Sequence, residues 1–315
     1  MQPPCKLSLV IPLYNEAANI PALCQEIRAC LKDLDYEVLL VDDGSSDTSF
    51  DLLCQEAEND LRFKVIGLRR NFGQSAALAA GFDMATGTVI VTMDGDLQND
   101  PADIPRLLSK LDEGYDVVSG WRKDRKDLLV SRRIPSLLAN RLISTMTGVQ
   151  LHDYGCTLKV YRREVLGELN LYGELHRFIP ALASQSGARL TELPVNHRPR
   201  TAGVSKYGID RTTRVLLDLV TVKFLLKYAT RPMQLFGKWG LYCWAFAAVS
   251  GLATLSMKWF DGLSMNRNPL LILTAFLLFS GVHFLALGLL AELITRTYHE
   301  TQGKAVYSVR KKVNL

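Results

Sequence analysis

The chain has 315 residues, 48% of them hydrophobic, and its formal net charge is +5 at pH 7. It is long enough for one large domain with a full-sized core and a further region beyond it. The modest positive charge is concentrated beside two apolar stretches, which favours anionic lipid headgroups over nucleic acid as a partner. The six cysteines lack the spacing of a metal site and indicate a reducing compartment.

Apolar runs alternate with amphipathic segments in the first part of the chain. Strands are expected at residues 7–12, 37–41, 63–68, from 89, and at 116–120, 157–161 and 192–195, the last at a sheet edge because it contains a proline. Helices are expected at about 20–32, from 48, and at 75–84, 101–113 and 135–147. Strands and helices in this order and spacing predict a parallel sheet and hence an α/β fold.

Polar residues follow the first two strands. Tyr14 and Glu16 lie in the loop before the first helix, and Asp42 and Asp43 lie at the tip of the second strand. An acidic residue at such a tip commonly accepts hydrogen bonds from ribose hydroxyls. The competing interpretation is that Asp42, or with less reason Asp43, is the N-cap of the helix that starts near Thr48.

The loop after the third strand, residues 69–74, is basic and contains a glycine. It opens a helix, and a helix amino terminus beside arginine is suited to binding a diphosphate. Arginines that are merely solvated at the surface would give the same pattern.

The strand that begins at Val89 delivers two carboxylates, Asp94 and Asp96, separated by Gly95. Residues two apart on an extended chain point the same way, and open α/β sheets bind ligands at the carboxyl ends of their strands. The two aspartates are therefore candidate ligands for one Mg²⁺ or Mn²⁺ ion, together with phosphate oxygens. Gly95 would let a ligand approach the backbone closely. An ordinary turn uses the same residues.

Basic segments follow the fifth strand, at residues 121–126 and 131–136. With the amphipathic helix expected next, we interpret them as a surface that meets lipid headgroups, the alternative being a solvated charged loop. Asp153 lies in a glycine-containing loop, where an acidic residue can be only a turn former. Residues 197–208 combine cations with glycines, which predicts a mobile loop that closes on a polyanion.

The last part of the chain contains two apolar stretches, residues 235–257 and 270–294, each longer than the roughly 20 residues needed to cross a bilayer. Lysines and arginines flank them on the outer sides, so the positive-inside rule places both flanks in the cytoplasm. No secretory signal precedes the first strand, which agrees with a cytosolic domain. We therefore expect a multi-pass membrane protein with a cytosolic domain over 1–208, an amphipathic interfacial helix over 209–234, two transmembrane helices within 235–294 and a basic cytosolic tail over 295–315.

Six segments of the chain occur in an order typical of one enzyme family. They are residues 10–16, 41–47, 71–74, 93–101, 153–156 and 200–208. With them the chain resembles the polyprenyl-phosphate glycosyltransferases of family 2 and the GT-A type, a group that includes bactoprenol glucosyltransferases and dolichol-phosphate mannose synthase. The segments span most of residues 7–208, and the two apolar stretches match the bactoprenol-linked branch.

The resemblance implies a Rossmann-like GT-A domain that moves a single sugar from a nucleotide-sugar, UDP-glucose by analogy, to the phosphate of a membrane polyprenol, with inversion. It implies Mg²⁺ or Mn²⁺ as cofactor, location in the inner membrane and a homo-oligomer such as a tetramer. Two helices do not enclose a translocation path, so moving the product across the membrane would need an oligomer or a partner flippase.

The resemblance also assigns roles to individual residues. Nucleoside binding falls to Pro12, Tyr14, Glu16 and Asp43. Asp94 would bind the ribose or the metal ion, and Asp96 and Gln98 would bind the metal ion and the diphosphate. Arg200 and Lys206 would bind the leaving diphosphate, and Asp153 would occupy a catalytic position. The acceptor phosphate would be bound by Arg122, Arg132 and Ser136, with the neighbouring Arg133 as the alternative to Arg132.

A phosphate acceptor changes what Asp153 has to do. A sugar hydroxyl must lose a proton to a base, whereas a phosphate monoester is already charged at neutral pH and attacks with little proton removal. The residues around Asp153 also differ from the Glu-Asp pattern of many family-2 enzymes. We therefore expect Asp153 to orient the sugar or the acceptor, while the metal and the basic residues stabilise the departing diphosphate.

Two other functions compete with this one. A processive polysaccharide synthase of the same fold would need more spans and a Gln-x-x-Arg-Trp motif, which the sequence lacks after residue 208. A non-catalytic membrane scaffold would keep the fold while it handles a lipid-linked sugar. The acidic pair and the basic loop residues assigned above argue against a scaffold.

Overall fold

The computed structural model describes residues 7–123, 140, 143–145, 147–167, 175–199, 232–260, 262–264, 268–301 and 306–315. It divides into two compact units, Met1–Val222 with Ala305–Leu315, and Lys223–Lys304. Several expectations lie outside the described residues, namely Arg132, Ser136, Arg200, Lys206, the interfacial helix and most of the helix at 135–147.

The first unit is built on a mostly parallel sheet. Its strands are β1 (Leu7–Leu13), β2 (Tyr36–Asp42), β3 (Phe63–Leu68), β4 (Val89–Thr92), β5 (Val117–Trp121), β6 (Lys159–Arg162), β7 (Leu190–Pro194) and β8 (Val309–Val313). Among the described residues their order is β7-β5-β6-β4-β1-β2-β3-β8. β1 pairs in parallel with β2 and β4, whereas β6 runs antiparallel between β4 and β5. The predicted α/β fold is confirmed, and β7 lies at an edge, as its proline indicated.

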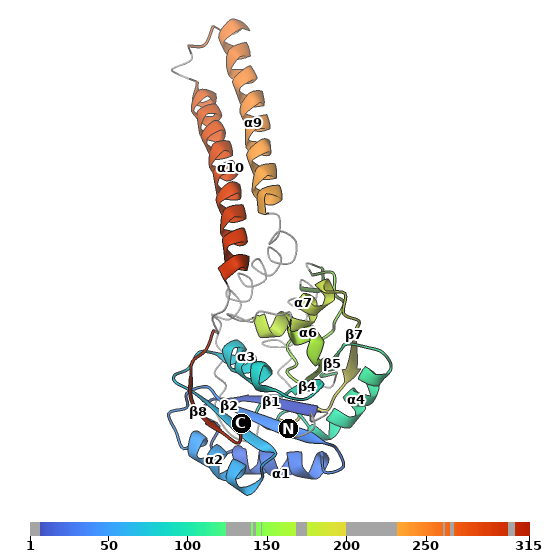
Figure 1. The fold of residues 1–315 in the computed structure, drawn as a ribbon. Helices are drawn as coiled ribbons and strands as arrows, with labels where there is room; N and C mark the ends of the chain where they lie inside the picture. The colour runs from blue at the N-terminus through green and yellow to red at the C-terminus, as the bar shows by residue number, and fades with distance from the viewer. Residues whose placement is uncertain are drawn as a thin grey trace. The chain divides into compact units, whose positions relative to one another are not determined.

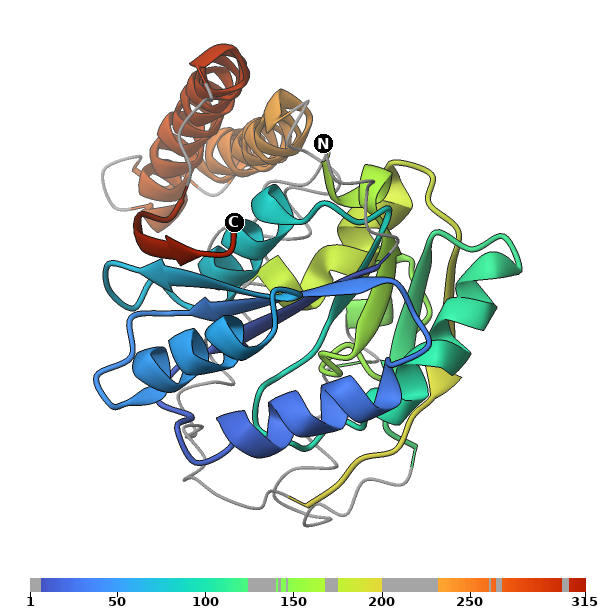
Figure 2. The same ribbon diagram turned by 60° about the horizontal axis from the view of Figure 1, so that its bottom comes forward.

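The central strands are continuous apolar runs because helices cover both faces of the sheet (Figures 1 and 2). One face packs against α1 (Ile20–Cys30), α2 (Ser49–Asn59) and α4 (Ile104–Asp112), and Leu9 and Ile11 of β1 belong to that core. The other face carries α3 (Gln74–Met84). Gly81 lets α3 approach the sheet closely, since a Cβ at this position would lie 2.3 Å from Cγ1 of Val10.

Four shorter elements complete the first unit: η1 (Pro101–Asp103), α6 (Arg163–Gly167), η3 (Leu175–Phe178) and α7 (Ile179–Gln185). The chain proceeds from β1 outward to β2 and β3, and then returns through α3 to β4 on the other side of β1. β1 and β4 therefore flank the point where the strand order reverses. In open α/β sheets this point, at the carboxyl ends of the strands, is where ligands bind.

The chain returns to the sheet at its C-terminal end. We expected a basic tail over residues 295–315, but the structure extends α10 (Pro269–Thr301) and makes Val309–Val313 a strand antiparallel to β3. The Asn314 side chain donates to the carbonyl oxygens of Ala57 at 2.7 Å and Phe63 at 3.0 Å. The prediction missed β8 because most of its residues are charged, as is common for a strand that protects a sheet edge.

The second unit is a helical hairpin of α9 (Pro232–Phe260) and α10. By length and composition α9 and the Pro269–Ala291 part of α10 are both able to cross a membrane, in agreement with the two predicted spans. The helices approach closely at Gly240 and Gly281, where a Cβ on Gly281 would lie 2.3 Å from the Trp244 ring and 3.1 Å from the Gly240 carbonyl oxygen. Small residues at such a crossing are typical of helices that pack within lipid.

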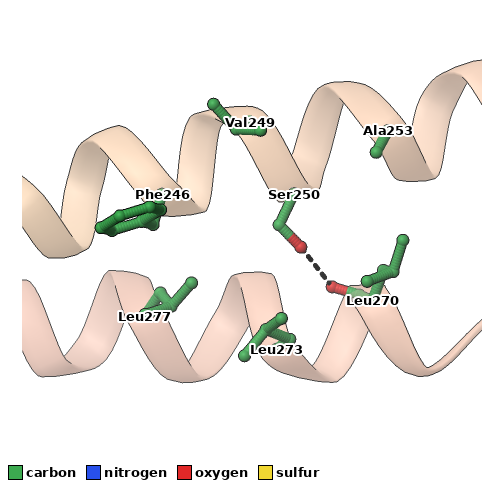
Figure 3. Close-up of a pocket in the computed structure, with 7 residues that line it drawn as sticks. All are labelled: Phe246, Val249, Ser250, Ala253, Leu270, Leu273 and Leu277. Atoms are coloured by element: carbon green, nitrogen blue, oxygen red, sulfur yellow. Dashed lines mark hydrogen bonds between the residues drawn. The ribbon is translucent and has the colours of Figure 1, made fainter.

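An open hollow of about 360 Å³ lies between the two helices of the hairpin (Figure 3). Its lining is apolar except for Ser250, whose hydroxyl donates to the Leu270 carbonyl oxygen at 3.1 Å. A nucleotide would find no charged partner there, so the candidate site must be sought in the first unit.

Candidate active site

The loops after β1 and β2 are joined to each other. The backbone N–H of Asn15 donates to Ser45 Oγ at 2.9 Å, and that of Glu16 donates to Ser49 Oγ at 2.9 Å. Asn15 has a left-handed backbone with φ of 53°, which asparagine tolerates better than most residues. These contacts hold Tyr14 and Glu16, both half-buried, beside the tip of β2.

Asp43 fixes the loop that opens α3. Its Oδ1 accepts from the backbone N–H of Phe72 at 2.7 Å and its Oδ2 from that of Gly73 at 2.9 Å. Burial raises the pKa of the Asp43 carboxyl, and these two hydrogen bonds oppose the rise. The geometry assigns Asp43 an organising role, and its predicted contact with a nucleoside stays a prediction.

The N-cap interpretation of Asp42 and Asp43 is wrong. The residue at the cap of α2 is Thr48, and the nearby carboxylate that accepts from the first turn is Asp47, which receives the Ser49 N–H at 2.9 Å. Asp42 instead accepts from the Ser45 N–H at 3.3 Å. The carboxylates of Asp42 and Asp43 therefore bind backbone N–H groups of other loop residues and do not cap α2.

Asp94 lies just beyond β4 and is half-buried. Its Oδ1 accepts from the Gln74 side-chain amide at 2.8 Å, so the start of α3 and the end of β4 meet at this carboxylate. Burial, and next the negative charge of Asp96, raise the pKa of Asp94 to about 6. Asp96 is buried, and its Oδ1 accepts from the backbone N–H of Gln98 at 3.2 Å.

These residues fit the predicted divalent cation. Two carboxylates close enough to disfavour joint ionisation form the arrangement that a cation between them relieves. Among the described residues no three acidic, histidine or cysteine side chains form a complete metal cage. A Mg²⁺ or Mn²⁺ ion held by one or two carboxylates takes its other ligands from water and substrate phosphate.

Gly95 has a structural reason to be glycine. We expected it to admit a ligand, but a Cβ on Gly95 would lie 2.6 Å from Cδ2 of Leu13, which is fully buried at the end of β1. The next but one residue, Leu97, has a positive φ of 61°. Packing against β1 and an unusual backbone together hold the acidic pair at the strand end.

Arg122 and Asp153 form a buried ion pair. Arg122 Nε donates to Asp153 Oδ2 at 2.7 Å and Nη2 to Oδ1 at 3.0 Å, and the Gly155 N–H also donates to Oδ1 at 3.1 Å. Burial lowers the pKa of Arg122, but the hydrogen bonds and charge of Asp153 raise it above its usual value. The structure thus joins a residue predicted for the acceptor phosphate to one predicted for catalysis.

The residues that precede this pair are also stacked. The rings of Trp121 and His152 lie 4.4 Å apart at 19°, and the His152 N–H donates to Glu192 Oε2 at 2.8 Å. The two loops are therefore held together both by the ion pair and by the aromatic contact. Neither contact was predicted, because each joins residues far apart in the sequence.

The segment after the acidic pair is tied to the chain that leads into the predicted closing loop. The Arg198 N–H donates to the Gln98 carbonyl oxygen at 2.9 Å, and its side chain pairs with Glu26 at 2.7 Å and Asp100 at 2.8 Å. Gln98 is thereby placed beside residues 196–199. The roles predicted for Arg200 and Lys206 fall outside the described residues.

Sequence reasoning gave no role to three residues that surround the acidic pair. Gln74 donates to the Asp94 side chain, Thr157 opposes the rise in the pKa of that carboxyl, and Lys159 is a buried cation nearby. Gln74 ends a segment already identified as a motif, and Lys159 interrupts an apolar strand. These two features of the sequence could have indicated that Gln74 and Lys159 belong to the site.

The sequence of this chain matches known proteins over nearly its whole length. Residues 8–169 match the family described as glycosyl transferase family 2. A dodecaprenyl-phosphate galacturonate synthase of Rhizobium johnstonii is 44% identical over 312 residues, which cover 97% of this chain and 92% of that protein. An undecaprenyl-phosphate 4-deoxy-4-formamido-L-arabinose transferase of Klebsiella pneumoniae is 38% identical, with 98% and 94% covered.

Solved structures share the fold of the first unit. Glucosyl-3-phosphoglycerate synthase from Mycobacterium tuberculosis, in complex with Mn²⁺ and uridine-diphosphate-glucose, aligns with a TM-score of 0.56 at 19% identity and covers 70% of this chain and 79% of that one. Mannosyl-3-phosphoglycerate synthase from Rubrobacter xylanophilus aligns with a TM-score of 0.54 at 15% identity, covering 70% and 74%. At this identity the likeness concerns the fold.

Proposed function

This chain belongs to glycosyltransferase family 2, and we propose that it transfers one sugar from a nucleotide-sugar to the phosphate of a polyprenol in a membrane. The observation that carries the proposal is its 44% identity, over 97% of the chain, to a protein named for dodecaprenyl phosphate. That span includes the acidic pair beyond β4 and both apolar helices.

For the sugar, the names of the relatives favour galacturonate or a formamido-arabinose over the glucose expected from the sequence. We propose a nucleotide-linked galacturonate as the first donor to test, because the relative named for it has the higher identity of the two. UDP-glucose remains the comparison donor.

In this reaction Asp94 and Asp96 would hold the divalent cation, with Gln98 beside them. The cation, when bound, supplies positive charge that neutralises the diphosphate of the donor as it leaves. Arg122 would present its remaining guanidinium nitrogen, Nη1, to the acceptor phosphate, while Asp153 holds the guanidinium plane in place. Asp153 would act by orientation, because a phosphate acceptor needs little proton removal.

The course of the chain supports a site on the cytoplasmic face of the inner membrane. Residues before and after the hairpin belong to the same compact unit, so both lie on one side of any membrane that the hairpin crosses. The basic residues at both flanks favour the cytoplasm for that side. In a variant whose six native cysteines are replaced by serine, a cysteine introduced at Leu263, in the loop between the helices, should be labelled from outside intact cells.

The decisive experiment is a transfer assay with the purified full-length protein in lipid nanodiscs. Radiolabelled nucleotide-linked galacturonate, formamido-arabinose and glucose are each supplied with polyprenyl phosphate and Mn²⁺ or Mg²⁺. A lipid that carries one sugar, formed only with cation, is the expected result. A polymer would indicate a processive synthase, and no product with any donor would argue for a scaffold.

A further inference from the structure

Lys159 is a buried cation that the proposed function leaves unused. Its side chain is on β6 and is only 3% exposed. Across the sheet it faces Thr92 of β4 on one side and Ser119 of β5 on the other. It therefore lies between the strand that delivers Asp94 and the strand that delivers Arg122.

The ammonium group of Lys159 bridges two carbonyl groups of one turn. Its Nζ donates to the carbonyl oxygen of Tyr154 at 3.2 Å and to that of Cys156. The same turn, residues 153–157, carries Asp153 at its start and Thr157 at its end. Asp153 binds Arg122, and Thr157 lies close enough to Asp94 to oppose the rise in the pKa of that carboxyl, so one turn supports both halves of the site.

Within the described residues, the ammonium group of Lys159 has no carboxylate in ion-pair contact. Among the ion pairs of the described residues none includes it. Burial lowers the pKa of Lys159. The negative charges of Asp153 and Asp94 oppose this fall in pKa, although neither carboxylate is hydrogen-bonded to the ammonium group. An ammonium in such a place costs free energy that a neutral side chain would not, so its charge needs a reason.

We propose that Lys159 is a positioning residue for sugar transfer. Its ammonium holds the 153–157 turn so that Asp153 engages Arg122 and Thr157 engages Asp94. Its charge, with that of Arg122, offsets the repulsion among the carboxylates of Asp94, Asp96 and Asp153 before a cation binds. The inference rests on the proposed function for its catalytic part, and on cation binding alone for its electrostatic part.

Substitution separates these two effects from a purely structural role. Lys159→Met keeps the shape of the chain but removes the charge and both hydrogen bonds, whereas Lys159→Arg keeps a cation with donors. We expect Lys159→Met to lower kcat about 10- to 100-fold with little change in KM for the donor, and Lys159→Arg to restore part of it. We also expect Lys159→Met to bind Mn²⁺ about threefold more tightly or better, because a positive charge beside the carboxylates is gone.

The test uses the full-length protein in nanodiscs, with melting temperatures and Mn²⁺ titrations measured beside the transfer assay. Lower turnover with tighter Mn²⁺ binding supports the inference, since a loosened fold would weaken both. Wild-type turnover and Mn²⁺ affinity in Lys159→Met would overturn it, as would weaker Mn²⁺ binding in a stably folded variant. If Lys159→Met fails to fold, Lys159→Gln, which keeps a donor, is compared in the same way. If the wild type transfers no sugar, the proposed function fails, but the Mn²⁺ comparison still decides the electrostatic part.

Discussion

Arg122 and Asp153 point their charged groups at each other across two loops, with Nε–Oδ2 at 2.7 Å and Nη2–Oδ1 at 3.0 Å. The exposed fractions of the two side chains are 14% and 4%, so the pair is shielded from water on most sides. A planar guanidinium that meets a carboxylate in two parallel bonds is fixed in orientation as well as position. Whatever Arg122 binds through its remaining nitrogen is therefore aligned by Asp153.

Replacing Arg122 with lysine should lower sugar transfer about 100-fold, because an ammonium group cannot make the two parallel bonds and loses the fixed orientation. The KM for the nucleotide-sugar should change little, since the change concerns the acceptor side. Both the rate of transfer and the KM are obtained from the rate at which radiolabelled lipid product forms. Asp153→Asn should have a comparable effect, and the double variant should be less impaired than the two single effects multiplied. Full activity in Asp153→Asn would show that the ion pair has no part in transfer.

Binding of Mn²⁺ should weaken as the pH falls through about 6. The pKa of Asp94 is raised to about 6, so below that value the carboxyl group is protonated and competes with the cation. We expect the affinity to fall up to about tenfold for each pH unit below the pKa, measured by calorimetry on protein without substrate. Asp94→Asn should bind weakly with little dependence on pH over this range. A wild-type affinity that stays flat from pH 7 to pH 5 would contradict the assignment.

Asp96→Ala should abolish transfer and leave membrane insertion intact, because the residue is proposed to act on the cation and lies in the first unit. The measurement compares lipid product with the amount of protein recovered in the membrane fraction. Chelation of the wild-type enzyme should have the same effect and should be reversed by added Mn²⁺ or Mg²⁺. Activity that persists in the presence of a chelator would exclude the cation from the mechanism.

Gly95→Ala should displace the acidic pair, because its new methyl group would overlap Leu13. We expect a loss of about 1–3 kcal/mol in stability and weaker Mn²⁺ binding. Leu13→Ala makes room for the methyl group, although it creates a cavity of its own. In the Leu13→Ala background, the additional substitution Gly95→Ala should therefore lower the free energy of unfolding by less than it does in the wild type. Equal costs in the two backgrounds would indicate that Gly95 is needed for a ligand and not for packing.

Glu37 provides a stability control away from the acidic pair. It is the second residue of β2, and it accepts from Ser8 Oγ at 2.6 Å and pairs with Lys64 Nζ at 2.7 Å. Burial alone would raise the pKa of Glu37, but these contacts lower it below its usual value. Its contribution to stability is therefore present above the pKa of the unfolded chain and is lost as the pH falls through the lower pKa of the folded state.

Glu37→Gln should accordingly lower the stability of the first unit at pH 7 by about 3 kcal/mol, since Lys64 loses its partner. The deficit should narrow in acid, where the wild type also loses the charge. Melting temperatures at pH 7 and at a series of values down to about pH 3 test both statements. Mn²⁺ affinity should be unchanged, because Glu37 lies at the amino end of its strand. A deficit that grew in acid would contradict the assigned direction of the pKa shift.

Local sequence patterns predicted most of the first unit. The strand at residues 63–68 has the same bounds in the structure, and the predicted spans lie within α9 and α10, because runs of apolar residues determine burial directly. The acidic pair at the end of β4 was also evident. The contacts of Arg122, Gln74 and Lys159 were not, since each depends on which strands are neighbours. The choice of Asp47 over Asp42 near α2 depends on loop geometry that residue types alone do not specify.

The position of β8 has a consequence for the order of assembly. The ribosome makes the first seven strands well before the last, so β3 is left as an open edge until the hairpin has been made. Only when the hairpin has turned back does Val309–Val313 become available to close that edge. A chain that stops before residue 309 would therefore carry an unpaired β3 edge, which is prone to pair with other chains, and only the complete chain closes it.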